Sequence, residues 1–286
     1  MLIQRLAIIG IGLIGGSLAR ALKRAGACAE VVGCGRNTRN LQQAIDLGVI
    51  DCYETNPASA VKNADMVVVA VPLGTMAKTF ATIHDALSPQ AIITDVGSAK
   101  ATVVSDAQQY LGQHFSRFVP AHPIAGTEKS GVAASFAELF EKHRVILTPL
   151  PETESQAVDI VSTMWQKTGA EVVKMSVENH DEVLAATSHL PHLLAYNLVD
   201  TLAKMDNQTE IFKFAAGGFR DFSRIASSDP QMWHDICFAN KDAILSVLEY
   251  FNIHLTQLTK AIQQGDSQHI KNIFTHAKTV RDKVCG

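Results

Sequence analysis

No stretch of this 286-residue chain approaches the roughly 20 consecutive apolar residues that a membrane-spanning helix needs. The amino terminus also lacks the pattern of a cleavable signal peptide, because residues 1–5 lead directly into a predicted strand. We therefore expect a cytoplasmic protein without a membrane partner.

The chain is equally poor in surplus positive charge and in metal-binding patterns. Its net charge is -3, so it has no basic excess with which to bind nucleic acid. Its five cysteines form no C-x-x-C pair, which argues against a disulfide framework and against a zinc site. The histidines include no H-E-x-x-H motif. We expect neither a metal nor a nucleic-acid partner.

The most informative segment lies close to the amino terminus. Residues 6–9 are four consecutive apolar residues, typical of a strand buried on both faces, and a helical pattern begins after Gly12. The glycines between them fit G-x-G-x-x-G: the first permits the turn, the second lets backbone approach a pyrophosphate, and the third lets helix pack on strand. This context favours nucleotide binding over an ordinary tight turn. The residues assigned to the nucleotide here are Gly10, Gly12, Leu13, Ile14 and Gly15.

The choice of cofactor depends on the end of a second predicted strand, residues 31–34. NAD-binding sites usually place Asp or Glu there to accept hydrogen bonds from the ribose 2′-hydroxyl, whereas this chain has arginines and no carboxylate. Guanidinium groups match the geometry of a 2′-phosphate, so we expect NADP, with NAD as the alternative. Two solvated arginines at a helix start would equally explain the pattern. The residues assigned to this end of the cofactor are Gly35, Arg36, Asn37 and Arg39.

Apolar segments alternate with helical patterns through the first part of the chain. This alternation predicts an α/β fold, a Rossmann-type doubly wound parallel sheet that binds its ligand at the carboxyl ends of the strands. Val71, Pro72 and Ser98 follow predicted strands and should therefore line the cofactor cleft. Further strands are expected at residues 66–72, 91–96, 118–121, 145–148 and 170–174, and helices around 37–48, 73–87 and 99–111.

The pattern changes beyond residue 174. Helices are expected at 178–206, 208–226, 231–263 and 267–284. The sequence thus predicts a dinucleotide-binding domain over residues 1–174 and an all-helical substrate-binding and dimerisation domain over residues 175–286. The helical part is too small to form a large core alone, so we expect a homodimer in which a second copy completes it.

Three short motifs place polar residues where chemistry is possible. Ser98 stands at a strand end, where a helix N-cap is the structural explanation. His122 directly follows a predicted strand and should lie at the same end of the sheet, although a lone histidine is more often structural. In the motif S-H-L-P-H, Pro191 should kink a helix, and the spacing keeps His189 and His192 on one face.

These motifs, together with the segment G-G-F-R-D-F-S-R-I-A at residues 217–226, resemble the prephenate/arogenate (cyclohexadienyl) dehydrogenase family of tyrosine biosynthesis. The resemblance runs from about residue 5 to at least residue 240. It implies an oxidative decarboxylation of prephenate to 4-hydroxyphenylpyruvate, of arogenate to tyrosine, or of both. Hydride would leave C4 of the cyclohexadiene for the nicotinamide, and carbon dioxide would depart as the ring becomes aromatic.

The resemblance also implies roles for individual residues. His122, as neutral imidazole, would take the proton of the C4 hydroxyl, and Ser98 would bond the same hydroxyl or orient His122. Arg224 would clamp a substrate carboxylate, and His192 would donate to the pyruvyl side chain of prephenate. The other residues assigned to the substrate are Thr127, Glu128, His189 and Arg220, with Glu128 expected to gate the entrance.

Two other functions remain open at this point. An oxidoreductase of the β-hydroxyacid dehydrogenase type has a similar build, but commonly depends on a lysine in its helical part, where this chain has histidines and arginines. A catalytically silent NADP-binding sensor would need no base beside the nicotinamide, so Ser98 and His122 argue against it.

Overall fold

The structure, a computed structural model, describes residues 1–285. The chain separates into two compact units after Lys241. The first unit contains all of the strands in the described residues, and the second consists of two long helices.

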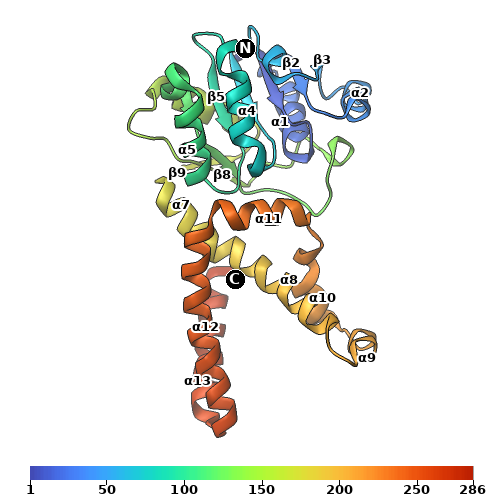
Figure 1. Ribbon diagram of the computed structural model, residues 1–286, viewed down its shortest axis with the longest axis vertical. Helices are drawn as coiled ribbons and strands as arrows, with labels where there is room; N and C mark the ends of the chain where they lie inside the picture. Colours follow the sequence, from blue (N-terminus) through green and yellow to red (C-terminus); the bar gives the residue numbers. More distant parts are fainter. Residues whose placement is uncertain (286) are drawn as a thin grey trace. The chain divides into compact units, whose positions relative to one another are not determined.

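The first unit is built on a six-stranded sheet in the order β3-β2-β1-β4-β5-β6, in which every neighbouring pair is parallel (Figure 1). Its strands are β1 (Ile3–Ile9), β2 (Cys28–Cys34), β3 (Cys52–Glu54), β4 (Met66–Val69), β5 (Ile92–Asp95) and β6 (Phe118–Val119). The chain builds outward in opposite directions from β1 and β4, which creates a switch point at their carboxyl ends. Ligands of doubly wound folds bind at that point. The predicted Rossmann-type fold is confirmed.

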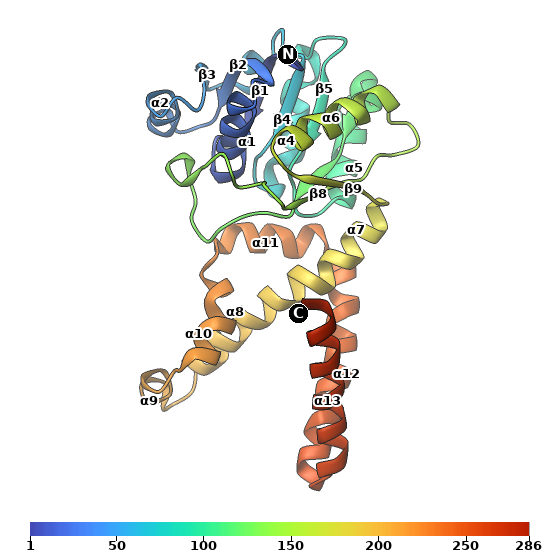
Figure 2. The same ribbon diagram turned by 180° about the vertical axis from the view of Figure 1, so that it is seen from behind.

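Helices cover both faces of this sheet, because its central strands are apolar on both sides. Leu6 and Ile8 of β1 belong to one apolar cluster, and Ala7 and Ile9 belong to another on the opposite face. The first cluster is covered by α1 (Leu13–Arg24), α2 (Thr38–Asp46) and α6 (Ser155–Lys167), the second by α3 (Pro57–Ala60), α4 (Met76–Ile83) and α5 (Ala101–Tyr110). Helices α4 and α5 are in view in Figure 1, and α6 in Figure 2. Short 3-10 turns are η1 (Leu73–Thr75), η2 (His84–Ala86), η3 (Gly112–Arg117) and η4 (Val132–Ala134).

A second, three-stranded sheet replaces the predicted extension of the first. It contains β7 (Ala121–Pro123), β8 (Arg144–Leu147) and β9 (Glu171–Lys174); β7 pairs antiparallel with β8, and β8 parallel with β9. The strand predicted over 118–121 is divided at Pro120, which has no N–H to continue a ladder and whose carbonyl accepts from the Thr148 amide at 3.0 Å. The prediction that residues 145–148 and 170–174 continue the parallel sheet is therefore wrong.

Beyond β9 the first unit is helical, as predicted, but with more breaks. It continues through α7 (Val177–Leu184), the π-helical turn η5 (Ala185–His189), α8 (Leu190–Ala203), α9 (Gln208–Lys213), α10 (Gly217–Ser223), the 3-10 turn η6 (Arg224–Ser227) and α11 (Pro230–Ala239). Pro191 lies in the first turn of α8, where proline is tolerated, and the irregularity is the π turn that precedes it.

The second unit contains α12 (Lys241–Gln264) from its second residue onward, and α13 (Ser267–Cys285). Asn240 ends α11 with a non-helical backbone, so the helix predicted over 231–263 is two helices. Several large apolar side chains on α12 and α13 are exposed, among them Leu245, Ile253, Ile262 and Phe274. Within residues 1–285, no helix combines the length and apolarity needed to cross a membrane.

Candidate active site

The glycine turn brings backbone from three segments into contact. Gly10 follows β1 with a φ of +105°, and a Cβ there would lie 2.2 Å from the carbonyl oxygen of Ala70 after β4. A Cβ on Gly15 would lie 2.2 Å from the Gly10 carbonyl oxygen. At Gly12, by contrast, a Cβ would meet nothing within 4 Å. Gly10 and Gly15 therefore serve packing, whereas Gly12 leaves open space.

That open space adjoins the amino terminus of α1. Gly12 is the N-cap residue and offers no side chain to the first N–H groups of the helix. Leu13 and Ile14, at the start of α1, are half-buried beside it. Unpaired amides and the positive end of the helix dipole form an anion site. The residues present here fit the pyrophosphate of a nicotinamide dinucleotide.

Helix α2, which follows β2, is hydrogen-bonded to the glycine turn. The side-chain oxygen of Asn37 caps α2 by accepting from the amides of Arg39 at 3.0 Å and Asn40 at 3.2 Å. The Asn40 side chain donates to the Ile11 carbonyl at 2.8 Å. Asn37 thus fixes the start of α2, and Asn40 fixes α2 against the glycine turn.

Cations gather at the end of β2 as the sequence indicates. Arg36 and Arg39 are exposed, and within residues 1–285 neither guanidinium takes part in a hydrogen bond or ion pair. A carboxylate is nevertheless present nearby, because Glu54 ends β3 directly opposite Cys34 in the register of the sheet. Burial, and then the charge of Glu54, raise the pKa of the Cys34 thiol to about 11. Sequence reasoning missed Glu54 because it missed the short, half-exposed strand β3.

The loops after β4 and β5 complete this edge of the sheet. Val71 is half-buried and Pro72 exposed at the start of η1, and Ser98 is half-buried with no side-chain hydrogen bond inside the described chain. The amide of Gly74 in η1 donates to the carboxylate of Asp235 on α11 at 3.2 Å. The helical segment therefore contacts the loop expected to face the cofactor.

A buried ion pair fixes the strand that carries His122. Lys100 and Asp95 are fully buried and form a salt bridge. The Lys100 ammonium also donates to the carbonyl of Ala121 at 2.7 Å, and the Ala121 amide donates to Asp95 at 3.1 Å. Both backbone groups of the residue before His122 are thus bound to the pair. The structure joins the end of β5 to β7, which places His122 beside the loop that contains Ser98.

His122 takes part in a chain of hydrogen bonds that ends on a carboxylate. Its Nδ1 lies 2.9 Å from Nε2 of His180 on α7, and Nδ1 of His180 lies 2.7 Å from Oδ1 of Asp181. The same carboxylate accepts from the backbone amides of Lys100 at 2.8 Å and Ala101 at 2.9 Å, at the start of α5. Asp181 is therefore attached to both α5 and the histidine pair.

The environment keeps these histidines neutral. Burial lowers the pKa of His122 well below its usual value, and the nearby His180, Lys100 and His189 act in the same direction. Burial also lowers the pKa of His180, although its hydrogen bond to Asp181 opposes this. For Asp181 the hydrogen bonds from His180 and the backbone amides outweigh burial and lower its pKa, so the carboxylate is ionised at neutral pH.

The other two histidines of the site share one face of the helix, as predicted. His192 stacks on Trp233 of α11 with ring centroids 3.8 Å apart, and His189 meets the same indole edge-on at 6.1 Å. The side-chain nitrogen of Asn240 donates to the Asp181 carbonyl at 2.8 Å and lies 3.1 Å from Nδ1 of His189. Within the described residues, Nε2 of His189 is buried without a hydrogen-bond partner.

The predicted substrate cations are more exposed than the histidines. Arg224 and Glu128 approach each other to 3.7 Å, with both side chains more than half exposed. Arg224 also lies close enough to His192 to lower the pKa of that imidazole, after the larger effect of burial. Thr127 accepts from a backbone amide of its own loop at 3.2 Å. Arg220 is exposed on α10 and, in the part of the chain described, has no side-chain bond to the other site residues.

Several residues of this site carried no sequence signal. His180, Asp181 and Trp233 lie in helices with ordinary apolar spacing, and Asn240 lies at the end of one. They meet His122 or His189 only through the tertiary fold. Lys100 lies two residues after Ser98, but its hydrogen bond to the Ala121 carbonyl joins it to a strand 21 residues away. In the described chain, no group of three or more His, Cys, Asp or Glu residues is arranged to hold a metal ion.

Comparisons with known proteins identify the family of the chain. The family model described as "Prephenate dehydrogenase, nucleotide-binding domain" matches residues 18–174, and "Prephenate dehydrogenase, dimerization domain" matches residues 176–276. Cyclohexadienyl dehydrogenase of Zymomonas mobilis is 39% identical, covering 97% of this chain and 95% of that protein. Prephenate dehydrogenase of Bacillus subtilis is also 39% identical, covering 96% of this chain and 74% of that protein.

A solved structure extends the likeness to three dimensions. Prephenate dehydrogenase from Aquifex aeolicus, crystallised with hydroxyphenyl propionate and NAD+, superposes with a TM-score of 0.92 at 38% identity and covers 98% of both chains. Similarity therefore spans both family models, the parallel sheet and the helical segment that brings His180 and Trp233 to the site. The chain belongs to the prephenate dehydrogenase family.

Proposed function

We propose that this enzyme oxidises and decarboxylates prephenate to 4-hydroxyphenylpyruvate in tyrosine biosynthesis, with a nicotinamide dinucleotide as hydride acceptor. The observation that carries the proposal is His122, a neutral imidazole whose preceding residue is bound to Asp95 at the carboxyl end of β5. The family to which the chain belongs supports a dehydrogenase over a silent sensor. The dinucleotide, when bound, accepts hydride from the substrate.

The protein's own contribution is to position the substrate and to remove a proton. His122 accepts the proton of the C4 hydroxyl while hydride leaves C4, and Ser98 bonds the same hydroxyl or orients His122. A neutral imidazole is required for this step, and burial maintains it. Loss of carbon dioxide then makes the ring aromatic. Aromatisation contributes much of the driving force of the reaction, in addition to the deprotonation by His122.

Recognition of the substrate's charges falls to the helical segment. Arg224 clamps one carboxylate of prephenate, because its ion pair with Glu128 is long and exposed and therefore costs little to break. Within the described residues Nε2 of His189 is buried without a hydrogen-bond partner, and we assign this nitrogen as a donor to the substrate. Thr127, Glu128 and Arg220 surround the entrance, with Glu128 able to release Arg224 when substrate arrives.

The choice between prephenate and arogenate depends on one side chain of the substrate. Arogenate carries an ammonium where prephenate carries a ketone, and a donor N–H favours the ketone. His192, held flat against Trp233, is the residue that we assign to this discrimination. Our second expectation is activity with both compounds, because a similar protein is named cyclohexadienyl dehydrogenase.

For the cofactor we propose NADP, with NAD as the alternative. Exposed Arg36 and Arg39 can both reach a 2′-phosphate beside Gly35. Glu54 is the counter-argument, because a carboxylate in that neighbourhood would accept hydrogen bonds from a free 2′-hydroxyl and repel a phosphate. The NAD+ bound by the Aquifex aeolicus enzyme belongs to that protein, so a direct comparison of both cofactors is needed.

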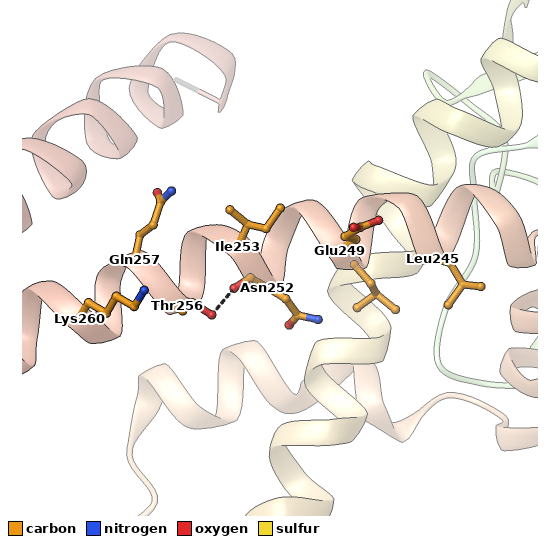
Figure 3. Close-up of a pocket in the computed structure, with 8 residues that line it drawn as sticks. Leu245, Glu249, Asn252, Ile253, Thr256, Gln257 and Lys260 are labelled. Carbon is orange, nitrogen blue, oxygen red and sulfur yellow. Dashed lines mark hydrogen bonds between the residues drawn. The ribbon is translucent and has the colours of Figure 1, made fainter.

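We further propose that the enzyme is a homodimer in which the second unit supplies the interface. Figure 3 shows a shallow groove along α12, lined by apolar Leu245 and Ile253 beside polar Asn252 and Lys260. Exposed apolar side chains of this kind mark interaction sites. The family model that matches residues 176–276 is named for dimerization. We propose that the dinucleotide-binding and helical domains divide at residues 174 and 175.

The decisive experiment follows the absorbance of the reduced cofactor, with prephenate and arogenate each offered with NAD and with NADP. Turnover of prephenate, fastest with NADP, is the expected result. Turnover of arogenate alone would contradict the assignment of His192, and faster turnover with NAD would contradict the assignment of Arg36. Absence of turnover in all four mixtures, from folded protein that still binds a dinucleotide, would overturn the proposed function.

A further inference from the structure

The hydrogen bonds around His122 determine which of its ring nitrogens is available. An ionised carboxylate can only accept, so Nδ1 of His180, at 2.7 Å from Asp181, must carry a proton. A neutral imidazole has one N–H only, so Nε2 of His180 is an acceptor. His122 Nδ1, at 2.9 Å from that nitrogen, must then donate. The lone pair of His122 is left on Nε2.

We propose that Asp181 and His180 are positioning residues that hold His122 in its Nδ1–H tautomer, so that Nε2 is the base for the substrate hydroxyl. This inference rests on the proposed function, because it names residues that support the same proton transfer. Neither residue needs to touch the substrate. They act through His122, as the carboxylate of a catalytic triad orients its histidine.

Three features of the structure favour an orienting role over simple packing. His180 is fully buried, yet both of its ring nitrogens take part in hydrogen bonds, Nε2 with His122 and Nδ1 with Asp181. Asp181 is held by two backbone amides of α5, so it cannot turn away from His180. The buried ammonium of Lys100 lies near His180 and opposes a second proton on that ring. With His180 neutral, the hydrogen bonds from His122 to His180 and from His180 to Asp181 pair every one of these groups.

Two substitutions of His180 separate orientation from packing. An asparagine side chain ends where Nδ1 of histidine lies, so His180→Asn can still donate to Asp181 but cannot reach His122. A glutamine side chain extends to the position of Nε2, so His180→Gln can still accept from His122. Both variants replace a buried ring by a smaller amide, which matches their packing losses.

The kinetic expectation differs between the two variants. His180→Asn should lower kcat about 100-fold while KM and the dinucleotide Kd change less than about 3-fold. His180→Gln should recover a large part of that loss. His114→Gln, which alters a buried histidine of η3, serves as the matched control and should leave kcat unchanged. Equal kcat values for the Asn and Gln variants, with both folded by thermal denaturation, would overturn the proposal.

A spectroscopic measurement tests the tautomer without reference to turnover. Long-range ¹H–¹⁵N correlation spectra of protein with ¹⁵N-labelled histidine distinguish the two tautomers, and the spectrum of His122→Asn identifies the signals of His122. The expected wild-type pattern is a protonated Nδ1 and an unprotonated Nε2, retained in His180→Gln and mixed in His180→Asn. A protonated Nε2 in the wild type overturns the inference, whereas inactivity with this tautomer intact overturns the proposed function alone.

Discussion

Two buried histidines of the site offer different hydrogen-bonding groups to the substrate, one an acceptor and the other a donor. His122 presents an acceptor, because its Nδ1 donates to His180. His189 presents a donor: the side-chain amide of Asn240 donates hydrogen bonds to the Asp181 carbonyl and to His189 Nδ1, which leaves the ring proton on Nε2. The acceptor suits a substrate alcohol that must lose a proton. The donor suits a substrate carbonyl or carboxylate that must accept a hydrogen bond.

Replacement of His122 should therefore affect the chemical step. His122→Asn removes the base but leaves a small polar side chain in its place, so kcat should fall at least about 100-fold with little change in KM. Steady-state kinetics with prephenate provide the measurement. Wild-type kcat in this variant would show that another group accepts the proton.

Replacement of Arg224 should instead affect substrate binding. Arg224→Ala removes the proposed carboxylate clamp, and KM should rise about 10-fold to 100-fold with a smaller change in kcat. Lys213→Ala on α9 removes one positive charge from the same helical segment and is the control for general electrostatic attraction. If both variants raise KM equally, Arg224 has no specific role.

At the scale of the element, the glycine turn makes two separable demands. A methyl group on Gly10 would collide with the Ala70 carbonyl and would require an L residue at a φ of +105°. The same group on Gly12 would enter open space. Gly10→Ala should therefore lower thermal stability, whereas Gly12→Ala should fold normally.

Gly12→Ala should fold normally but should bind the dinucleotide more weakly than the wild type. We expect Gly12→Ala to keep the wild-type Tm and to weaken binding of the dinucleotide at least about 10-fold, measured by calorimetry, because its methyl group occupies space beside the pyrophosphate. Wild-type affinity in this variant would mean that the cofactor's phosphates lie elsewhere.

Sequence reasoning succeeded where a local pattern determines structure. Four apolar residues before Gly10 and the spacing of the glycines identify strand, turn and helix, because each depends only on neighbours in the chain. It failed at Pro120, where the chain passes from one sheet to the other, and at β3, which is short and half-exposed. The local sequence of a strand determines neither the direction in which it pairs nor the sheet to which it belongs.

The site divides in the same way. His122, His189 and His192 stand in unusual local motifs. His180 becomes recognisable only when α7 meets β7, and Asn240 only when the end of α11 meets η5. Their partners lie 58 and 51 residues away in the sequence. The π turn η5 is also invisible to helical periodicity, although it ends at His189 and fixes where that ring points.

At the scale of the whole molecule, the buried histidines should make stability depend on pH. Burial lowers the pKa of His189 to about 4, and the pKa values of His122 and His180 are lowered too. The unfolded chain, with histidine pKa values near about 6.5, binds more protons in this range. The stabilisation is therefore complete above about pH 6.5 and is lost as pH falls toward about 4.

Each such histidine contributes a slope of up to about 1.4 kcal/mol per pH unit to the free energy of unfolding. Urea denaturation at a series of pH values between about 5 and about 7 should show stability rising with pH. His189→Asn should reduce the slope. A free energy of unfolding that is constant across this range would mean that these rings titrate alike in the folded and unfolded chain.

Assembly should respond to charge on α12. Ile253→Asp places a carboxylate in the groove shown in Figure 3 and should shift the dimer toward monomer at low protein concentration, as measured by analytical ultracentrifugation. Gln263→Asp adds the same charge outside the groove and is the control. Equal association of the two variants would place the interface elsewhere.

The carboxylate of Asp181, bound to the first amides of α5, has a practical consequence for recombination between family members. A chimera that joins the nucleotide-binding part of one relative to the helical part of another at residue 174 would separate α5 from the residue that caps it. The histidine relay would be divided at the same joint. A crossover placed after Asn240 would inherit both intact, so the natural unit of exchange is longer than the dinucleotide fold itself.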